Sequence, residues 1–577
     1  MKNVGTLEMF GPVIRSEGVE FRARVEGAQM VTVIVCDSEQ KPLRTIETRS
    51  VEGSVFSGID EEGKAGDLYL YSIDGRPPIP DLYSQYQPFG SNGPSMVVDS
   101  AYPWRDADYK TRSLREIVVY EMHVGAFSNA GTFHKVIERL PYFQSMGINC
   151  LALMPVAEWS GRWNWGYDPC FYFAPFHGYG HPDTLRKLID TAHMHGISVF
   201  LECAFGHTGP GGVFSAFDRS LIEPRSVEDW LQKFNLSSPA TKDFIIQNIV
   251  YWLDLFHADG VRVDVHPFQE NESARSILKT AAQMAAARGK WIVGCTDEAT
   301  AVDGSGMAMS SPLIQIGNRE LQGGGAPIVN RWPEQIASSM NGNTGIKYIS
   351  NHDLIGNRPF GGRINFKVVP ESYRALSALL CLGPQTPMLF MGQEFATQTP
   401  FLFFTDHEPT AARSVRSSRK AEYIQHGLDA DLTNLLPDPQ DPVHFEVSKL
   451  DWAEIYKEPQ RGVLLLYKEC LNLRRDLPVF RPPLNSHFKV TVLNEGIIAL
   501  FYTAQGGTPA HLVLCDLTGN HTMSLTDITG IEATTKWGLV LSTNDKRFGG
   551  LAEDIFDSTE QTLRFRDPET LIFRAVA

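Results

Sequence analysis

The sequence has few cysteines, no long apolar run and no excess of positive charge, and each absence excludes a class of protein. Its eight cysteines form no C-x-x-C pair in 577 residues, which argues against a disulfide framework or a zinc site. No stretch reaches the roughly 18 apolar residues that cross a bilayer, and the N-terminus lacks the apolar core of a secretion signal. A net charge of -15 would repel a nucleic-acid backbone or an anionic membrane. We therefore expect a cytoplasmic protein that binds no nucleic acid, membrane or metal.

Two kinds of hydrophobic pattern are present instead. Apolar and polar residues alternate over residues 1–85 and again over 483–577, which predicts antiparallel strands and a β-sandwich at each end. We expect the first sandwich to be of a carbohydrate-binding kind. A Pro- and Gly-rich linker at 86–112 leads to residues 113–482, where continuous apolar runs alternate with segments of helical spacing. Buried strands alternating with helices form a parallel sheet, and seven or eight strands favour closure. The predicted fold is therefore α/β, a (β/α)₈ TIM barrel flanked by two β-sandwiches.

Seven strands of the barrel can be placed from their apolar runs. They are residues 117–124, 149–156, 197–205, 260–265, 291–295, 346–350 and 387–392. One intervening helix covers "SPATKDFIIQNIVYWLDLF", which Ser238 can cap and in which Pro239 suits the first turn. Its apolar residues recur three or four apart on one face, at Ile246, Ile249, Leu253 and Phe256.

Charged side chains alternate with valines in "GVRVDVH", at the end of the strand 260–265. A period of two sends Val261 and Val263 to the helix layer, and Arg262 and Asp264 into the barrel. The reactive groups of such barrels lie at the C-terminal ends of the strands. Arg262 would hold Asp264 ionised, as a nucleophile requires. A purely structural pair of these two residues is the alternative.

A second carboxylate follows another strand, in "YISNHDLIG". There His352 and Asp353 end the strand 346–350, and His207 ends an earlier strand in "ECAFGH". Two carboxylates at the mouth of one barrel are the arrangement that glycoside hydrolysis uses. His207 by itself is more typical of a hydrogen-bonding residue than of a catalyst.

The loop at 161–183 is rich in aromatic residues. It contains Trp163, Trp165, Tyr167 and Tyr179 together with Asp168. Sugar rings stack on aromatic faces and their hydroxyl groups bind carboxylates, so we interpret Trp165, Tyr167 and Asp168 as substrate-binding residues. The alternative is that these large side chains form the core of the loop.

In chain order, these strand ends resemble the α-amylase superfamily, and within it the maltooligosyltrehalose trehalohydrolases. The resemblance rests on "ECAFGH", "GVRVDVH", "WIVGCTDE" and "YISNHD", and on the longer stretches "YEMHVGAFSNAGTF", "LMPVAEWSGRWNWGYD" and "PDPQDPVHFEVSKLDW". It implies hydrolysis, with retention, of the α-1,4 bond next to the trehalose end of maltooligosyl-trehalose. It implies no metal or organic cofactor, and it leaves the oligomeric state open.

The resemblance also implies roles for residues that match its motifs. Asp264 would be the nucleophile, and Asp353 would stabilise the transition state. The residues that would hold the sugar in the cleavage subsite are Arg262, His207 and His352, with Tyr167 stacked on the ring. The chain departs from the pattern at Glu202 and Gly206, where the superfamily has aspartate and asparagine.

The most serious departure is Cys295, which stands where the superfamily has its acid glutamate. A general acid contributes about 10²- to 10⁴-fold to the rate, and a thiol is shorter, donates weakly and has an ordinary pKa near 8.5. Glu298 or Asp297 could replace it, and a site with no ordinary acid is the third possibility. The favoured hypothesis is a trehalose-releasing hydrolase with Glu298 as acid. The alternatives are a non-catalytic α-glucan-binding relative and a glucan-branching transglycosylase.

Overall fold

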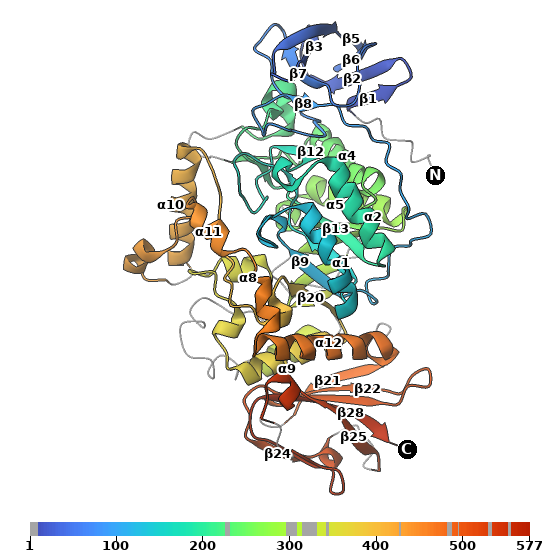
Figure 1. Cartoon of the computed structure of the whole chain (residues 1–577), viewed down its shortest axis with the longest axis vertical. Coiled ribbons are helices and arrows are strands. Elements are labelled where there is room, and N and C mark those ends of the chain that lie inside the picture. Colours follow the sequence, from blue (N-terminus) through green and yellow to red (C-terminus); the bar gives the residue numbers. More distant parts are fainter. Residues whose placement is uncertain are drawn as a thin grey trace.

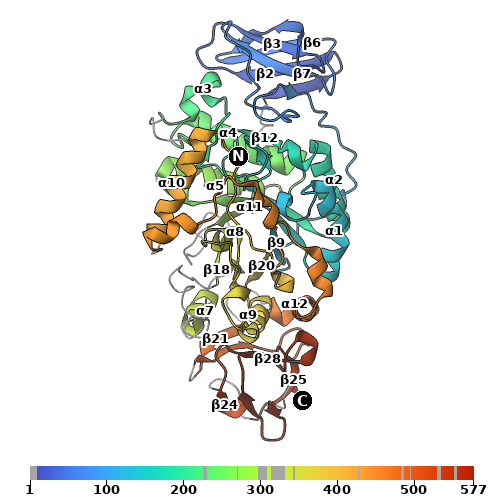
Figure 2. The ribbon, with the colours of Figure 1, turned by 60° about the vertical axis from the view of Figure 1, so that its left-hand side comes forward.

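The protein has a β-domain at each end of a central barrel, and Figures 1 and 2 place the two β-domains at opposite ends of the long axis. The computed structural model describes residues 10–224, 231–269, 271–295, 308–313, 332–341, 345–425, 428–481, 487–493, 496–528, 534–551 and 555–576. Glu298 and Asp297, the two sequence-based candidates for the acid, lie outside these ranges.

The N-terminal β-domain consists of two antiparallel four-stranded sheets. One has the order β1 (Gly11–Arg15), β2 (Gly18–Arg24), β6 (Val55–Asp60), β5 (Arg49–Glu52), and the other β4 (Pro42–Glu47), β3 (Val31–Cys36), β7 (Leu68–Ile73), β8 (Ser95–Met96). Burial alternates along β2, as the sequence pattern predicts. The rings of Phe21 and Tyr69, one from each sheet, meet with centroids 4.9 Å apart. Strand β8 pairs with β7, so this domain includes part of the stretch that the sequence suggested as linker.

The central domain is a closed barrel of eight parallel strands. Their order around the barrel follows the chain: β9 (Val119–Met122), β10 (Cys150–Leu153), β13 (Ser198–Cys203), β16 (Gly260–Asp264), β17 (Trp291–Cys295), β18 (Ala308–Pro312), β19 (Ile346–Tyr348) and β20 (Thr386–Phe390). The predicted TIM barrel and its seven predicted strands are confirmed. The eighth, β18, was not predicted because "AMSSP" contains no continuous apolar run.

Helices cover the outside of the barrel. They include α1 (Phe133–Met146), α2 (Pro182–Met194), α4 (Pro239–Leu255), α5 (Glu272–Ala286), α7 (Trp332–Met340), α9 (Pro370–Leu382) and α12 (Gln460–Asp476). In α4, Pro239 occupies the first turn as predicted, but the Ser238 side chain does not cap the helix. Its hydroxyl donates to Ser220 instead, at 3.3 Å. None of the described helices has the length and apolar character needed to span a bilayer.

Two further features lie near the open end of the barrel. The short helix α8 (His352–Gly356) directly follows β19, and it begins at the N-cap Asn351, whose side chain accepts from the Leu354 amide at 2.7 Å. After β20 the chain forms an arm of α10 (Pro409–Gln425), η8 (Ala430–Leu435) and α11 (Pro442–Val447), which projects to the side of the barrel (Figure 1).

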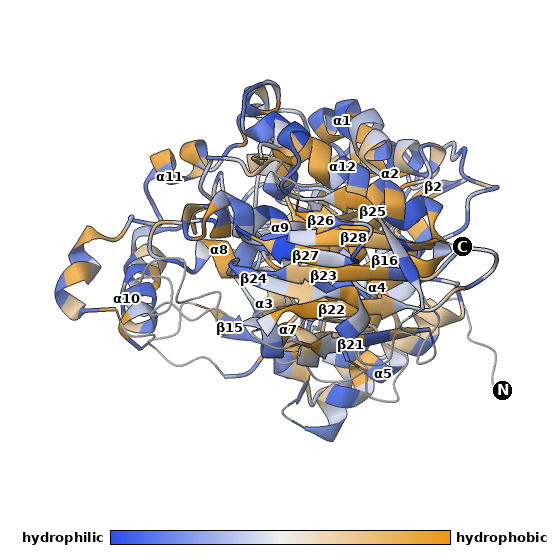
Figure 3. Cartoon of the chain, turned by 90° about the horizontal axis from the view of Figure 1, so that it is seen from below, coloured by the Kyte–Doolittle hydropathy of each residue, from blue (hydrophilic) through white to orange (hydrophobic). Residues whose placement is uncertain are grey.

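The C-terminal β-domain packs beneath α9 and α12. Its larger sheet has the order β21 (Phe488–Val492), β22 (Ile498–Tyr502), β23 (His511–Asp516), β28 (Glu569–Val576), β25 (Lys536–Ser542), and its smaller sheet β24 (His521–Ser524), β27 (Thr562–Phe565), β26 (Phe556–Asp557). The view from below shows hydrophobic residues along β22 and β28 (Figure 3). Arg374 of α9 donates to the Thr543 carbonyl at 3.0 Å, and Thr570 donates to the Ala375 carbonyl at 2.9 Å. These bonds between domains fix the sheet against the barrel.

Candidate active site

A cleft of about 590 Å³ opens at the C-terminal ends of the barrel strands. Its lining residues are Tyr167, Glu202, His207, Arg262, Asp264, Val265, His266, Gln269, Cys295, Tyr348, Asn351, His352 and Asp353. Six of the residues predicted from the sequence are therefore brought together here, namely Asp264, Asp353, Arg262, His207, His352 and Tyr167. Their convergence follows from the parallel sheet, because all the strands end at the same face.

Asp264 is the last residue of β16, and its side chain is exposed to the cleft. One carboxylate oxygen accepts from the backbone amide of His266 at 3.0 Å. Burial of the surrounding site raises the pKa of Asp264, and the negative charge of Asp353 acts in the same direction, while His266 opposes them. The carboxylate has no ion pair with an arginine or lysine among the described residues.

Arg262 pairs with two glutamates, so the expected pairing with Asp264 is wrong. Its Nη1 donates to Glu121 and, at 2.8 Å, to Glu202. The strand register explains this choice, because Glu202 of β13 lies directly opposite Arg262, whereas Asp264 is two residues further along β16. All three partners are buried. The pairing satisfies charges that would otherwise be costly inside a barrel.

Glu121, on β9, connects two of the predicted sugar-binding residues, and the sequence analysis missed it. Its carboxylate accepts from the backbone amide and from the ring Nδ1 of His352, both at 3.0 Å, and from Arg262. Burial opposes ionisation, but the positive charges of Arg262 and His352 lower the pKa of Glu121. The available signal was an acidic residue within the apolar run "VVYEMHV", because such a residue needs a partner when buried.

His352 and Asp353 form an ion pair at the start of α8. The His352 Nε2 lies 3.3 Å from Asp353 Oδ2 and 2.7 Å from the Tyr167 hydroxyl. Burial opposes protonation of His352, yet the carboxylates of Asp353 and Glu121 raise its pKa well above the ordinary value. Burial also opposes ionisation of Asp353, and His352 lowers the Asp353 pKa. The environments therefore shift Asp264 and Asp353 in opposite directions, which is typical of carboxylates with different roles.

Tyr167 and Trp165 contact His352 from different sides. The Tyr167 ring stacks on the imidazole with centroids 5.0 Å apart and planes inclined by 22°. The Trp165 ring is nearly perpendicular to the imidazole, with centroids 5.4 Å apart and planes inclined by 87°. Its Nε1 donates to the Leu402 carbonyl at 3.0 Å. Trp165 is only 3% exposed and does not line the cleft. It was expected to bind sugar directly, but it supports His352 from the protein side.

Most of the aromatic loop is core, as the alternative interpretation stated. Trp163 and Tyr179 are buried, and Asp168, which we expected to bind substrate, is also buried outside the cleft. Its carboxylate lies 2.9 Å from Nε2 of His407, which precedes α10. The loop packs its large rings against the arm, as Trp163 does against Phe445 of α11. Burying such rings stabilises the fold, so they are not left exposed for a ligand. Of the loop residues proposed for binding, Tyr167 lines the cleft.

Cys295 ends β17 directly opposite Asp264 in the register of the two strands. The thiol is half-buried and lines the cleft. Burial raises the pKa of Cys295 well above its usual value, and although Arg262 opposes this, Glu202 and other carboxylates add to it. The thiol therefore keeps its proton, and it is a weak acid at neutral pH.

Three buried groups beside Arg262 lie close enough together to hold a metal ion, and two of them already bind a cation. Among the described residues, ligand atoms of Glu121, Glu202 and His352 lie within 4.8 Å of one another. The guanidinium of Arg262 binds both glutamates. A fixed positive charge thus occupies the position in which a metal would balance these carboxylates.

Comparisons with known proteins identify the family. The α-amylase catalytic-domain model matches residues 116–233. A malto-oligosyltrehalose trehalohydrolase of Deinococcus radiodurans is 31% identical, with 81% of this chain and 83% of the relative covered. The protein of that name from Rhizobium sp. is 32% identical, with 71% and 77% covered. The crystal structure of a putative α-amylase from Salmonella typhimurium has a TM-score of 0.81 at 26% identity, covering 99% of this chain and all of that one.

A GBS pullulanase, SAP, in complex with maltotetraose shares the fold, with a TM-score of 0.74 at 16% identity and coverage of 99% and 88%. Three observations therefore point to the same family. They are the eight-stranded barrel, the carboxylates at its mouth and the sequence identity over most of the chain. The chain belongs to the malto-oligosyltrehalose trehalohydrolase family of the α-amylase superfamily.

Proposed function

We propose that the protein is a retaining glycoside hydrolase that cleaves the α-1,4 bond next to the trehalose end of maltooligosyl-trehalose and releases trehalose. The observation that carries the proposal is the placement of Asp264 and Asp353 on one open cleft, in a chain of this family. Retaining hydrolysis requires a carboxylate nucleophile that substrate can reach, which Asp264 would supply, and an acid that protonates the leaving group.

In the proposed mechanism, Asp264 attacks the anomeric carbon as the bond to the trehalose oxygen breaks. A covalent glycosyl-enzyme forms, and water then hydrolyses it with net retention. Asp353 is held ionised beside His352. Its negative charge would stabilise the positive charge that develops on the sugar ring in both transition states.

The neighbouring residues would bind the sugar in the reacting subsite. His352 and Arg262 are both anchored by Glu121, so their positions are set before substrate arrives. His207 and Tyr167 line the same cleft, and the Tyr167 ring would pack against the pyranose. Groups held in place in this way lose little entropy when the substrate binds.

The leaving trehalose oxygen needs a proton, because an alkoxide leaves far more slowly than an alcohol. The raised pKa of Cys295 makes its thiol a poor donor. We assign this role to Glu298, three residues further along the chain, as the proposed replacement acid. Because Glu298 lies three residues beyond the position of the superfamily's acid, we expect it to donate the proton less efficiently, so that formation of the glycosyl-enzyme is the slow step.

A second candidate function is α-glucan binding without turnover. The residue that favours it is Cys295, since the thiol stands beside Asp264 where a proton donor is needed. Both candidates predict binding of α-glucan in the cleft, and they differ in whether a product forms.

The test is incubation of the purified protein with maltooligosyl-trehalose, with trehalose followed by chromatography and the anomer of the glucan product by NMR. We expect trehalose and an α-anomeric product, and a loss of at least about 10³-fold on Asp264→Asn. The matched control is Asp254→Asn. Asp254 of α4 is exposed, does not line the cleft, and pairs with Arg288 at a distance of 2.7 Å. Binding by calorimetry with no sugar released by the wild type would overturn hydrolysis in favour of the second candidate.

A further inference from the structure

The short helix α8 carries His352 and Asp353, and the arm holds it from outside. Arg419 of α10 donates from Nη2 to the carbonyl of Gly356, the last residue of α8, at 3.2 Å. Its Nη1 donates to the side-chain oxygen of Asn357 at 2.9 Å. Arg419 therefore contacts both the carbonyl at the end of α8 and the residue that follows it, across 66 residues of sequence from Asp353.

Asn357 connects Arg419 to the Asp353 carboxylate. Its Nδ2 donates to Asp353 Oδ1 at 3.3 Å, while the other carboxylate oxygen faces His352. An asparagine amide has one donor end and one acceptor end. A guanidinium only donates, so Arg419 requires the oxygen end of Asn357, and the NH₂ end must then point to Asp353. Without Arg419, the oxygen end of Asn357 loses its donor, and the amide is held at one end only, by the Asp353 carboxylate.

Arg419 is itself held on several sides. Its guanidinium pairs with Glu422 at 2.9 Å and donates to the Tyr423 hydroxyl at 3.0 Å. The guanidinium carbon lies 4.5 Å from the ring centroid of Phe403 and 5.0 Å from that of Tyr423. Planar stacking and several hydrogen bonds fix the fork geometry, which a lysine could not reproduce.

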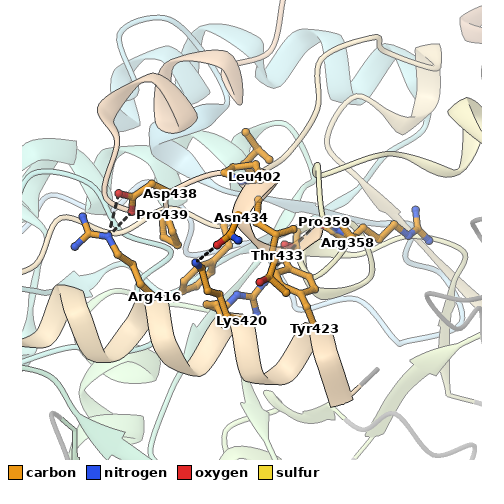
Figure 4. A pocket seen from close by; sticks show the side chains of 15 residues that line it. Arg358, Pro359, Leu402, Arg416, Lys420, Tyr423, Thr433, Asn434, Asp438 and Pro439 are labelled. Atoms are coloured by element: carbon orange, nitrogen blue, oxygen red, sulfur yellow. Dashed lines mark hydrogen bonds and ion pairs between the residues drawn. The ribbon is translucent and has the colours of Figure 1, made fainter. Parts of the chain in front are cut away.

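Other cations of α10 have different partners. A pocket of about 180 Å³ lies between α10 and the segment that follows it, and Figure 4 shows its lining. There Arg416 pairs with Asp438 at 2.8 Å, and Lys420 donates to Asn434 at 3.3 Å (Figure 4). These contacts tie the arm to itself. Arg416 is thus a suitable control for a charge on the same helix.

We propose that Arg419 is a positioning residue, which orients the Asp353 carboxylate by fixing the amide of Asn357. This inference rests on the proposed function, because it treats Asp353 as the group that stabilises the transition state. The arm would then set the orientation of the Asp353 carboxylate in the cleft, through Arg419 and Asn357.

The test is a double-mutant cycle on trehalose release with Arg419→Ala, Asn357→Ala and the double variant. We expect Arg419→Ala to lower kcat about 10-fold with KM within about twofold, because the contact acts in the transition state. The double variant should be no slower than Asn357→Ala alone, since Arg419 acts through Asn357. Arg419→Lys should restore little, and Arg416→Ala should match the wild type.

Crystal structures of the wild type and Arg419→Ala provide a readout that does not depend on turnover. In the variant, we expect Asn357 to lose its contact with Asp353 while α8 keeps its fold. A retained contact, multiplicative losses in the cycle, or an equal loss in Arg416→Ala would overturn the proposal. If the wild type cleaves no glucan, the proposed function fails, and the crystal structures alone decide whether Arg419 orients Asp353.

Discussion

Replacing Cys295 by glutamate should increase turnover. Cys295 and Asp264 are directly opposite each other on neighbouring strands, which lie about 4.8 Å apart. A glutamate at 295 would thus place its carboxyl group near the roughly 5–5.5 Å from the nucleophile that retaining enzymes use. The burial and neighbouring carboxylates that raise the pKa of the Cys295 thiol would also keep a glutamate protonated.

The expected magnitude follows from what general acids contribute. A correctly placed acid increases kcat about 10²- to 10⁴-fold, or about 3 to 5.5 kcal/mol of barrier. Because Glu298 would already supply part of this in the wild type, we expect Cys295→Glu to gain at the low end, about 10²-fold. The cleft of about 590 Å³ has room for the longer side chain. The assay is initial-rate release of trehalose from maltooligosyl-trehalose by wild type and Cys295→Glu, with folding checked by thermal unfolding.

The matched control is Cys295→Gln, which has the length of glutamate but no acidic proton. We expect it to stay at the wild-type rate, and Cys295→Ala to do the same, because the thiol contributes little as an acid. A folded Cys295→Glu variant within threefold of wild type, or an equal gain in Cys295→Gln, would refute the reasoning. Loss of wild-type activity on Glu298→Gln would then identify Glu298 as the acid in use.

Three other predictions concern Glu121, Gly356 and Glu394, a buried residue that follows β20 and accepts from the hydroxyls of Tyr120 and Tyr142. Glu121→Gln removes a carboxylate that raises the pKa of His352, so the alkaline limb of kcat/KM should move to lower pH. Burial raises the pKa of Glu394 to about 7, so wild-type stability should fall as pH rises from about 4.5 to 7. Glu394→Gln should make that slope shallower by the contribution of Glu394, worth up to about 3 kcal/mol in chemical denaturation at pH 8, while Asp81 and Glu569, whose pKa values burial also raises to about 7, keep their contributions. A Cβ on Gly356 would lie 2.1 Å from Trp165, so Gly356→Ala should cost about 1–3 kcal/mol and lower kcat.

Each of these has its own control. Gly362→Ala places its Cβ 3.8 Å from the nearest atom, on Phe366, and should leave stability and kcat unchanged. For Glu394, the same slope of stability against pH in the Gln variant would contradict the assignment. For Glu121, an unchanged pH profile alongside a lower kcat would mean that its carboxylate does not control the charge on His352.

Much of the fold was predictable because its strands are long apolar runs between turn residues. The run at 260–265 identified both its strand and the inward direction of Arg262 and Asp264, since side-chain alternation is a local property. Strand β18 was not predicted because Ala308–Pro312, "AMSSP", has no continuous apolar run. It is a strand because its neighbours β17 and β19 supply hydrogen-bond partners. The residues of a strand do not by themselves specify which other strands it will pair with.

The site shows the same division. The sequence by itself determined the barrel, the polar residues at its strand ends and the substitution at Cys295, because each is expressed in residue type and spacing. Only the tertiary structure decided that Arg262 pairs with Glu121 and Glu202, that Trp165 lies behind His352, and that Arg419 reaches Asn357. The physical reason is that register between strands and contact between distant segments set which charges meet, and neither is encoded within a single stretch of chain.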